Sequence, residues 1–353
     1  MNLPEDKKSK VVRSASVILA VSFLMLTMFT SCEVEFTPNA PWKEVPVVYC
    51  VLDQDDDTSW VRVERCFLSD GDMHDYGLVS DSINYPVGSI RVTLLAYNGG
   101  VCVDSLVCRD TLVDRHGGHF ASAAQPMYYT TGKLNRNYRY KLNVTRVADG
   151  STLATTDSIA LIKYDAYDVP SDGIPVSPIT KPTNTQGFGF FDRNGTKAVC
   201  SIVWREMENA RLYQPVIRFY YGQDGDTNYI DLPCSTVARG NTSGSLRTEY
   251  SREAFLNALK SNLDTLPKQY LMKVDIFLTA CTEDLNVYIS SLNIAAEADQ
   301  GREPYSNIRG GKGIFAARRT HVFKALPADD SMNPIGTPNP GLYAYLKTLN
   351  VGF

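Results

Sequence analysis

The sequence predicts a mainly β protein, with an N-terminal immunoglobulin- or fibronectin-like β-sandwich and a second β-rich domain carrying two or three helices. Short runs of β-branched and aromatic residues recur along the chain, and several alternate apolar with polar side chains. Turn-forming Gly, Asn and Asp residues separate these runs at the spacing of a sandwich. A proline-rich stretch at residues 164–186 divides the chain into two such regions.

The chain begins with a segment that is typical of a secretory signal. Four basic residues precede a run of apolar or small residues at positions 15–29. This run is too short to span a bilayer comfortably, and small residues follow it. We predict that residues 1–31 are a lipoprotein signal peptide. An uncleaved transmembrane anchor and an ordinary signal peptide are the alternatives.

Residues 29–32, Phe-Thr-Ser-Cys, resemble the bacterial lipobox, although Leu rather than Phe is the usual first residue. In that motif the cysteine is acylated and becomes the first residue of the mature protein. Each buried methylene contributes roughly 0.8 kcal/mol, so two or three acyl chains hold a soluble domain on a membrane. We predict lipidation at Cys32 and a proline-bearing tether over residues 32–44.

The first domain is predicted over residues 45–163. Its opening strands enclose a polar turn and form a hairpin, and a polar loop over residues 69–85 follows. Asn98-Gly99-Gly100 is a tight-turn signal between two further strands. The predicted strands cover residues 45–52, 60–68, 89–97, 101–112, 138–147 and 151–161.

Leu134 and Tyr140 lead into an alternating strand and resemble the tyrosine corner of immunoglobulin-like domains. In that corner the tyrosine hydroxyl binds nearby backbone. Two ordinary core residues are the simpler interpretation.

Residues 164–186 are predicted to be a linker, and residues 187–326 a β-rich domain with helices. Helices are predicted over residues 251–263, with Ser251 as N-cap, and over residues 284–296, with Thr282 as cap, because apolar residues recur there at helical spacing. Residues 327–353 form a Pro- and Asn-rich C-terminal tail. The strands predicted in the second domain cover residues 188–191, 197–205, 216–221, 229–232, 270–280 and 313–323.

The charge balance argues against a nucleic-acid partner. The precursor has 35 basic and 39 acidic residues, and the mature chain, without the four basic and two acidic residues of the signal, carries a net charge of −6. A mildly acidic, well-mixed surface lacks the basic patches that phosphate binding requires.

Seven cysteines remain besides Cys32, so at least one thiol has no partner within the chain. No Cys or His cluster has zinc spacing. Cys50 and Cys66 are the first candidate for a disulfide, because they fall near each other across the predicted hairpin. The connectivity stays open.

An acidic turn could hold calcium. Asp53, Asp55, Asp57 and Glu64 fall at positions 1, 3, 5 and 12 of an EF-hand loop, but Thr58 occupies position 6, where glycine is needed. The flanks are strands rather than helices, so a solvated turn is the favoured interpretation. Asp224-Gly225-Asp226 is a second acidic turn of the same kind.

Other chemical motifs are weak. The glycines of residues 310–313 lack both the spacing and the strand–loop–helix context of a phosphate loop. His116 and His119 share a glycine-rich turn without an evident third metal ligand. HExxH and GxSxG motifs are absent from the sequence. We therefore predict no catalytic residues, no metal and no cofactor, and a protein that is not an enzyme.

Aromatic residues are the remaining signal for binding, because exposed Trp and Tyr stack on sugars and anchor protein interfaces. Burial in the sandwich core is the simpler interpretation. The aromatic residues singled out are Trp42, Trp60, Tyr128, Tyr129, Phe188, Phe190, Phe191, Phe219, Tyr220 and Tyr221.

Together with the lipobox and the first two strands, the run SNIRGGKGIF at residues 306–315 resembles an uncharacterised family of Bacteroidota lipoproteins, often encoded beside TonB-dependent transporters. The resemblance implies a lipid-anchored outer-membrane protein on the periplasmic or cell-surface face, accessory to nutrient uptake. It implies no reaction and no ligand-binding residues. A structural or adhesive cell-surface module without a transporter partner is the alternative function.

Overall fold

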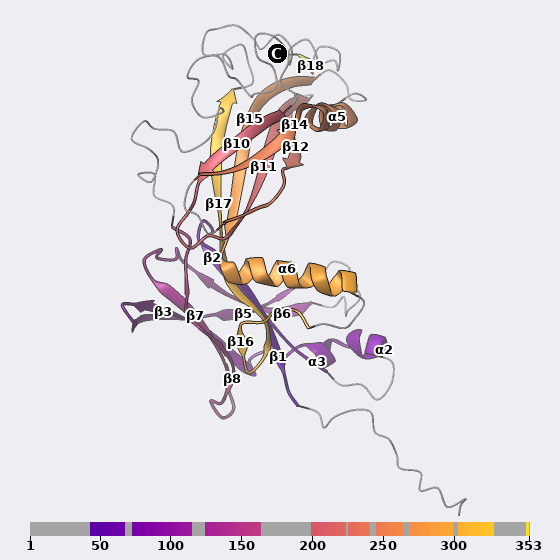
Figure 1. Ribbon diagram of the computed structural model, residues 1–353. Helices are drawn as coiled ribbons and strands as arrows, with labels where there is room; N and C mark the ends of the chain where they lie inside the picture. The colour runs from indigo at the N-terminus through magenta and orange to yellow at the C-terminus, as the bar shows by residue number, and fades with distance from the viewer. Residues whose placement is uncertain are drawn as a thin grey trace, which may run out of the picture. The chain divides into compact units, whose positions relative to one another are not determined.

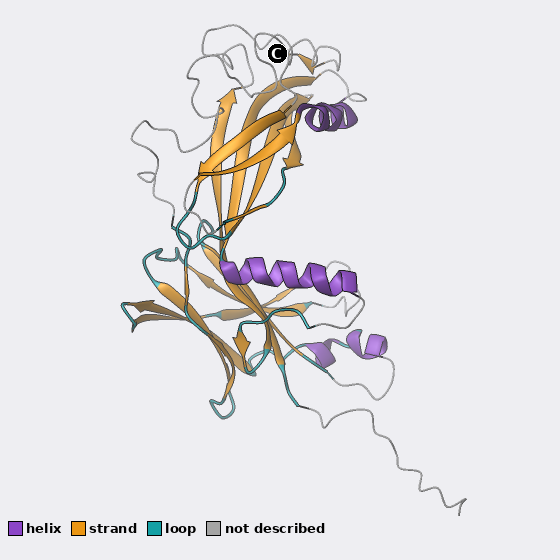
Figure 2. Cartoon of the chain, in the orientation of Figure 1, coloured by secondary structure: helices purple, strands orange, loops and turns teal. Residues whose placement is uncertain are grey.

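The computed structural model describes most of the chain after the predicted signal peptide and tether. The described ranges are 43–67, 73–114, 124–163, 199–223, 225–240, 245–263, 269–298, 303–327 and 351–352. Strands dominate these ranges, and the predicted mainly β fold class is confirmed (Figure 2). No helix within them is long and apolar enough to cross a membrane.

The larger of the sheets contains strands from both halves of the chain (Figure 1). Its main path has the order β12-β11-β15-β17-β1-β2-β6-β5, and β13 and β18 pair beside that path. The bounds of its strands are β1 (Pro46–Asp53), β2 (Thr58–Arg65), β5 (Arg109–Val113), β6 (Gln125–Thr131), β11 (Leu212–Gln223), β12 (Asp226–Pro233), β13 (Val237–Ala238), β15 (Gln269–Cys281), β17 (Lys312–Pro327) and β18 (Val351–Gly352).

A second sheet has the order β16-β8-β7-β3-β4, with β9 paired to β7, and a third consists of β10 and β14. The bounds of these strands are β3 (Ile90–Asn98), β4 (Val101–Val107), β7 (Arg139–Arg146), β8 (Thr152–Thr156), β9 (Ile159–Ala160), β10 (Val199–Arg205), β14 (Ser245–Ser251) and β16 (Ile308–Arg309).

The N-terminal strands form a β-sandwich, since inward-facing residues of the two large sheets share one hydrophobic core. Along β1, buried and half-buried residues alternate over the whole strand, as its sequence predicts. The core combines Val48 and Leu52 of β1 with Leu94 of β3, Leu142 of β7 and Phe315 of β17. Apolar residues at alternate positions therefore place these strands in two facing layers.

Tyr140 ties a turn to the sandwich, as the sequence predicts. Its ring is buried, and its hydroxyl accepts a hydrogen bond of 2.7 Å from the Asn135 N–H. Leu134 is buried beside it in the same core.

Residues 303–318, which lie outside the predicted first domain, complete its sandwich. The first half of β17 pairs in parallel with β1, and β16 pairs with β8 in the facing sheet. A Cβ added at Gly313, where φ is +112°, would lie 2.0 Å from the Val48 carbonyl oxygen. Only glycine permits this approach, so the RGGKG segment is a turn built to fit between the two sheets.

Asn307 stabilises the segment of residues 303–318 that completes the sandwich. Its side-chain amide donates to the Phe315 carbonyl at 2.7 Å and accepts from the Phe315 N–H at 2.9 Å. The second half of β17 pairs with β15, and one long strand therefore belongs to both the sandwich and the C-terminal strands.

The two predicted long helices are present as α5 (Arg252–Leu263) and α6 (Glu283–Ala298). Ser251 caps α5 as predicted, because its hydroxyl accepts the Ala254 N–H at 2.9 Å. Thr282 occupies the predicted N-cap position of α6, because its carbonyl accepts the Asn286 N–H at 3.1 Å. Its hydroxyl, however, accepts the Ala317 N–H of β17 at 3.2 Å. Ile289 and Leu292, which belong to the apolar stripe predicted for α6, are exposed rather than buried.

The polar loop predicted over residues 69–85 contains two short helices, α2 (Met73–Gly77) and α3 (Ser80–Ile83). Ile83 and Tyr85 are buried, which anchors this segment to the sandwich. The sequence has no helical spacing of apolar residues here, so these short helices were not predicted.

Candidate binding surface

Several predicted features lie outside the described residues. They are the signal peptide, the lipidation site Cys32, the linker, most of the C-terminal tail, and the residues Trp42, His116, His119, Phe188, Phe190, Phe191 and Asp224.

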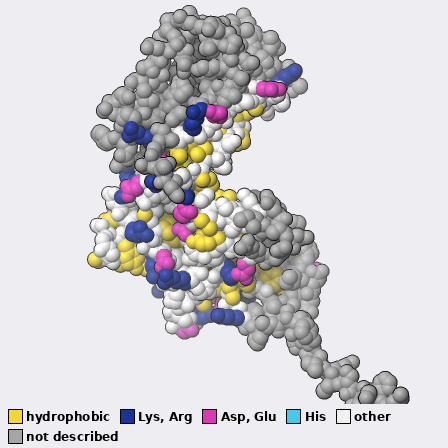
Figure 3. Space-filling view, viewed as in Figure 1, with side chains coloured by type: hydrophobic (Ala, Val, Ile, Leu, Met, Phe, Trp, Pro, Cys, Tyr) yellow, Lys and Arg dark blue, Asp and Glu magenta, His cyan; other side chains and the backbone are white. Residues whose placement is uncertain are grey.

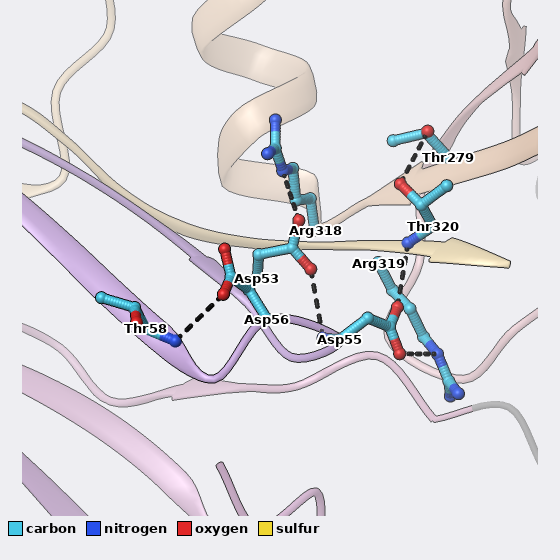
Figure 4. A network of polar contacts seen from close by, with 8 residues as sticks. All are labelled: Asp53, Asp55, Asp56, Thr58, Thr279, Arg318, Arg319 and Thr320. Carbon is cyan, nitrogen blue, oxygen red and sulfur yellow. Dashed lines mark hydrogen bonds and ion pairs between the residues drawn. The ribbon is translucent and has the colours of Figure 1, made fainter. Parts of the chain in front are cut away.

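The acidic turn between β1 and β2 is bound to β17 (Figure 4). The Arg318 Nε–H donates to the Asp53 carboxylate at 2.9 Å. One oxygen of Asp55 accepts the Thr320 N–H at 3.1 Å, and the other lies 3.4 Å from Arg319 Nε. The two carboxylates therefore join β17 to a turn that precedes it by 265 positions.

The other acidic groups of the predicted EF-hand positions point to separate partners. Glu64 pairs with Arg62 at 2.5 Å, and Asp57 lies 3.9 Å from Lys133. Among the described residues, no three His, Cys, Asp or Glu side chains are arranged to hold a metal ion. These carboxylates therefore take part in ion pairs and accept backbone hydrogen bonds within the protein.

The predicted Cys50–Cys66 disulfide is wrong. The Cys66 N–H donates to the Val45 carbonyl, so Cys66 lies five positions along the hairpin from Cys50. That separation is about 17 Å along a strand, whereas bonded cysteines have Cα atoms within about 7 Å. Cys50 is buried and Cys66 is exposed, and both are free thiols.

Half of the aromatic residues singled out in the described ranges belong to the core. Tyr128, Phe219 and Tyr221 are buried. Trp60 is 42% exposed and packs against Tyr129 with ring centroids 5.2 Å apart. Burial in the core thus explains three of the six, and Trp60, Tyr129 and Tyr220 remain partly or largely exposed.

A group of partly and fully exposed side chains lies on strands β11, β12 and β15, and we call it the Arg218 surface. The strand register places Arg218 directly opposite Asp231 on one side and Asp275 on the other. Tyr220 lies directly opposite Tyr229 in the next row of the same face. The residues of the Arg218 surface are Arg218, Tyr220, Tyr229, Asp231 and Phe277.

Arg218 is held on three sides. Its guanidinium carbon lies 4.0 Å from the ring centroid of Tyr229 and 4.4 Å from that of Phe277. Its Nε and a terminal nitrogen donate to the two oxygens of Asp231 at 2.6 and 2.7 Å. Stacking and a bidentate pair fix the guanidinium plane, so Arg218 is already ordered before any partner arrives.

The surroundings of Arg218 stabilise the charged form of its guanidinium. Hydrogen bonding to Asp231, and to a smaller extent Tyr220, raises the pKa of Arg218 above its ordinary value, against the opposing effect of burial. Asp231, Arg218 and Asp275 form a row of alternating charge across three strands. Beside this row the Tyr229 ring remains 55% exposed. An ordered arginine beside an exposed tyrosine is a combination that anchors protein interfaces.

An apolar pocket of about 230 Å³ lies on the opposite face of the same strands. Leu232, Cys234, Tyr250 and Ala254 are among the residues that line it. Sites for drug-sized ligands are about 300–1,000 Å³, so this pocket is smaller than most of them. We therefore consider the Arg218 surface the stronger candidate.

The sequence pattern singles out Tyr220 but not Arg218, Tyr229, Asp231 or Phe277. Alternation within the predicted strand at residues 216–221 places Arg218 and Tyr220 on one face, and this was an available signal. The other three residues join them only through pairing with β12 and β15.

No protein-family model and no curated protein matches the chain. Among solved structures, the C-terminal globular domain of an oligosaccharyltransferase from Pyrococcus abyssi is similar to it at 12% identity with a TM-score of 0.15. The match covers 82% of this chain and 46% of that one, so this chain spans less than half of that structure's length.

Proposed function

We propose that this chain is a lipid-anchored, non-catalytic binding or accessory protein of the bacterial outer membrane, and that its partner belongs to a TonB-dependent uptake system. The lipobox and Cys32 support the anchor, and the resemblance of residues 306–315 supports the transporter partner. The observation that carries the binding role is the Arg218 surface. Its guanidinium is held in place and an exposed Tyr229 ring lies against it.

The Arg218 surface suits a macromolecular partner. Interfaces concentrate their binding energy in a few Tyr, Trp and Arg side chains. Preorganised side chains lose less conformational entropy on binding than mobile ones do. The Arg218–Asp231 pair, at 2.6 and 2.7 Å, supplies this order before contact.

A pull-down from solubilised outer membrane tests the proposal with the acylated full chain. We expect a TonB-dependent barrel to be recovered with the wild type and with Tyr229→Phe, which keeps the ring. With Tyr229→Ala we expect recovery to fall at least about tenfold, as at an interface hot spot. Tyr229 is exposed, so either variant should fold normally.

Equal recovery with all three proteins would contradict the assignment of the Arg218 surface as the binding site. Recovery of the chain alone, or with extracellular matrix, would contradict the transport role and favour a structural or adhesive module.

A further inference from the structure

Large apolar side chains are exposed at the end of the sandwich where the chain enters β1. We call them the tether-end patch. They are Tyr76 (43% exposed), Leu78 (50%), Val79 (51%), Val87 (60%) and Val147 (50%). Isolated exposed apolar residues are ordinary, but five at one end of a domain indicate a surface that something covers.

An ion pair and a backbone hydrogen bond place the loops of this patch beside the start of β1. Glu44 forms an ion pair with Arg146, at the end of β7. Val147 follows it and donates its N–H to the Ser89 carbonyl at 2.9 Å, next to the loop that carries Val87. The start of β1, α3 and the turn between β7 and β8 accordingly lie at one end of the sandwich (Figure 1).

The α2–α3 segment reaches the same end through β2. Glu64 forms an isolated β-bridge with Asn84, just after α3. Phe67, which follows β2, stacks on Tyr76 of α2 with ring centroids 6.5 Å apart. Leu78 and Val79 lie in the short connection between α2 and α3. The segments that carry the five patch residues therefore all contact the sandwich at the end where the chain enters β1.

The position of Cys32 in the sequence indicates what could cover the patch. Cys32 precedes Glu44 by 12 positions, and a fully extended segment of that length spans at most about 40 Å. An acylated cysteine lies in the membrane interface. The end of the sandwich at Glu44 is therefore kept close to the bilayer.

The charges at this end favour apolar contact over attraction to anionic lipid. Arg146 pairs with Glu44, Lys312 with Glu303, and Arg309 with Asp157. Arg65 donates to the Asp81 carbonyl. Figure 3 shows hydrophobic surface beside Lys, Arg, Asp and Glu side chains on the lower part of the face it displays. Cations that are already paired add little attraction to a charged membrane surface.

We propose that the tether-end patch rests on the phospholipid bilayer that holds acylated Cys32, with Leu78, Val79, Val87 and Val147 in the interfacial layer. This inference rests on the lipid anchor of the proposed function. The sandwich then stands on the membrane by the end where the chain enters. Tyr76 suits such a position, because tyrosine places its ring in the interface and its hydroxyl in water.

Photocrosslinking tests this orientation with the acylated full chain in phosphatidylcholine vesicles that contain a phospholipid with a diazirine near its headgroup. Peptide mass spectrometry locates the adducts. We expect adducts at residues 76–79, 87 and 147, with little change between low and high salt. Val101, which is 66% exposed at the opposite end of the β3–β4 hairpin, is the internal control and should carry none.

Two matched variants sharpen the result. The double variant Val87→Ser and Val147→Ser should lower the adduct yield over the whole patch at least about fivefold, since it removes apolar contact with the interface. Val101→Ser should leave that yield unchanged. All three positions are exposed, so the melting temperature should stay close to that of the wild type.

Adducts at Val101 equal to those in the patch, or adducts confined to the tether, would overturn the inference while leaving the anchor in place. The mass of the N-terminal peptide reports acylation of Cys32 separately. An unacylated Cys32 would overturn both the anchor and this inference, so the two failures are distinguishable.

Discussion

Two regions of the same sheet pair arginine with aspartate, and they differ in what each pair connects. Arg318 and Asp53 are 265 positions apart, and their ion pair joins β17 to the first hairpin of the sandwich. Arg218 and Asp231 are 13 positions apart, on strands that already pair through a long ladder.

This difference separates a structural contact from a candidate binding surface. The Asp53 and Asp55 carboxylates accept donors from β17, and their side chains are 20% and 39% exposed. The Arg218–Asp231 pair adds little to pairing that its strands already have, and it leaves the neighbouring Tyr229 ring exposed. Removing the first kind of contact should weaken the fold, and changing the second should mainly affect binding.

The largest effect is expected where β17 meets β1. Gly313→Ala should destabilise the protein by about 3–5 kcal/mol, because the added Cβ meets the Val48 carbonyl oxygen and the backbone has a φ of +112°. Gly132→Ala is a matched control, since Gly132 has a φ of +125° and nothing within 4 Å of the added Cβ. It should cost only about 1–2 kcal/mol. Urea unfolding measures both, and equal losses would contradict the importance of the close approach.

The acidic turn should give a smaller effect. Asp55→Ala removes acceptors for the Thr320 N–H and for Arg319, and should cost about 1–2 kcal/mol of unfolding free energy. Asp57→Ala should cost no more than about 0.5 kcal/mol, because Asp57 and Lys133 are highly exposed and 3.9 Å apart. A larger loss from Asp57→Ala, or a rise in melting temperature on adding calcium to the wild type, would favour a metal site in this turn.

On the Arg218 surface the effect on stability should be smaller again. Arg218→Lys keeps the charge but loses the bidentate pair with Asp231 and the stacking on two rings, and should cost about 1 kcal/mol. Arg247→Lys is the control, because Arg247 pairs with Glu249 on β14 and their side chains are 62% and 53% exposed. It should change the free energy of unfolding by less than about 0.5 kcal/mol. Similar losses from the two variants would contradict the ordering attributed to Arg218.

The sequence was sufficient for features that depend on neighbours along the chain. The alternation of β1, the hydroxyl contact of Tyr140 and the Ser251 cap of α5 each involve residues a few positions apart. Local pattern and chemistry determine such features, and they were predicted.

Features that depend on distant partners were not predicted. Gly313 must be glycine because Val48, 265 positions earlier, approaches its α-carbon. The carboxylates of the acidic turn have the spacing of calcium ligands. Their actual partners on β17 lie equally far away in the sequence, so the local sequence shows no sign of them. Likewise, Tyr229 and Phe277 join Arg218 only when β12 and β15 pair with β11. Sequence spacing contains no information about these approaches.

The smallest expected effect is a pH dependence at the join between β15 and β17. His321 lies opposite Leu278, and burial, with a further contribution from Arg319, lowers its pKa below the ordinary value, while Asp55 acts in the opposite direction. The unfolded chain therefore binds a proton at this site before the folded chain does as the pH falls below about 6.5. Stability from neutral His321 is complete above that pH and is lost as the pH falls toward the lower folded-state pKa.

His321→Gln should remove this contribution while leaving the carboxylates that titrate at lower pH unchanged. We expect the unfolding free energy of the wild type to fall more between pH 7 and pH 5.5 than that of the variant. Urea unfolding at several pH values measures the difference. Parallel pH profiles for the wild type and the variant would show that His321 has the same pKa in the folded and unfolded chain. Proton binding would then not distinguish the contact between β15 and β17 from the Arg218 surface.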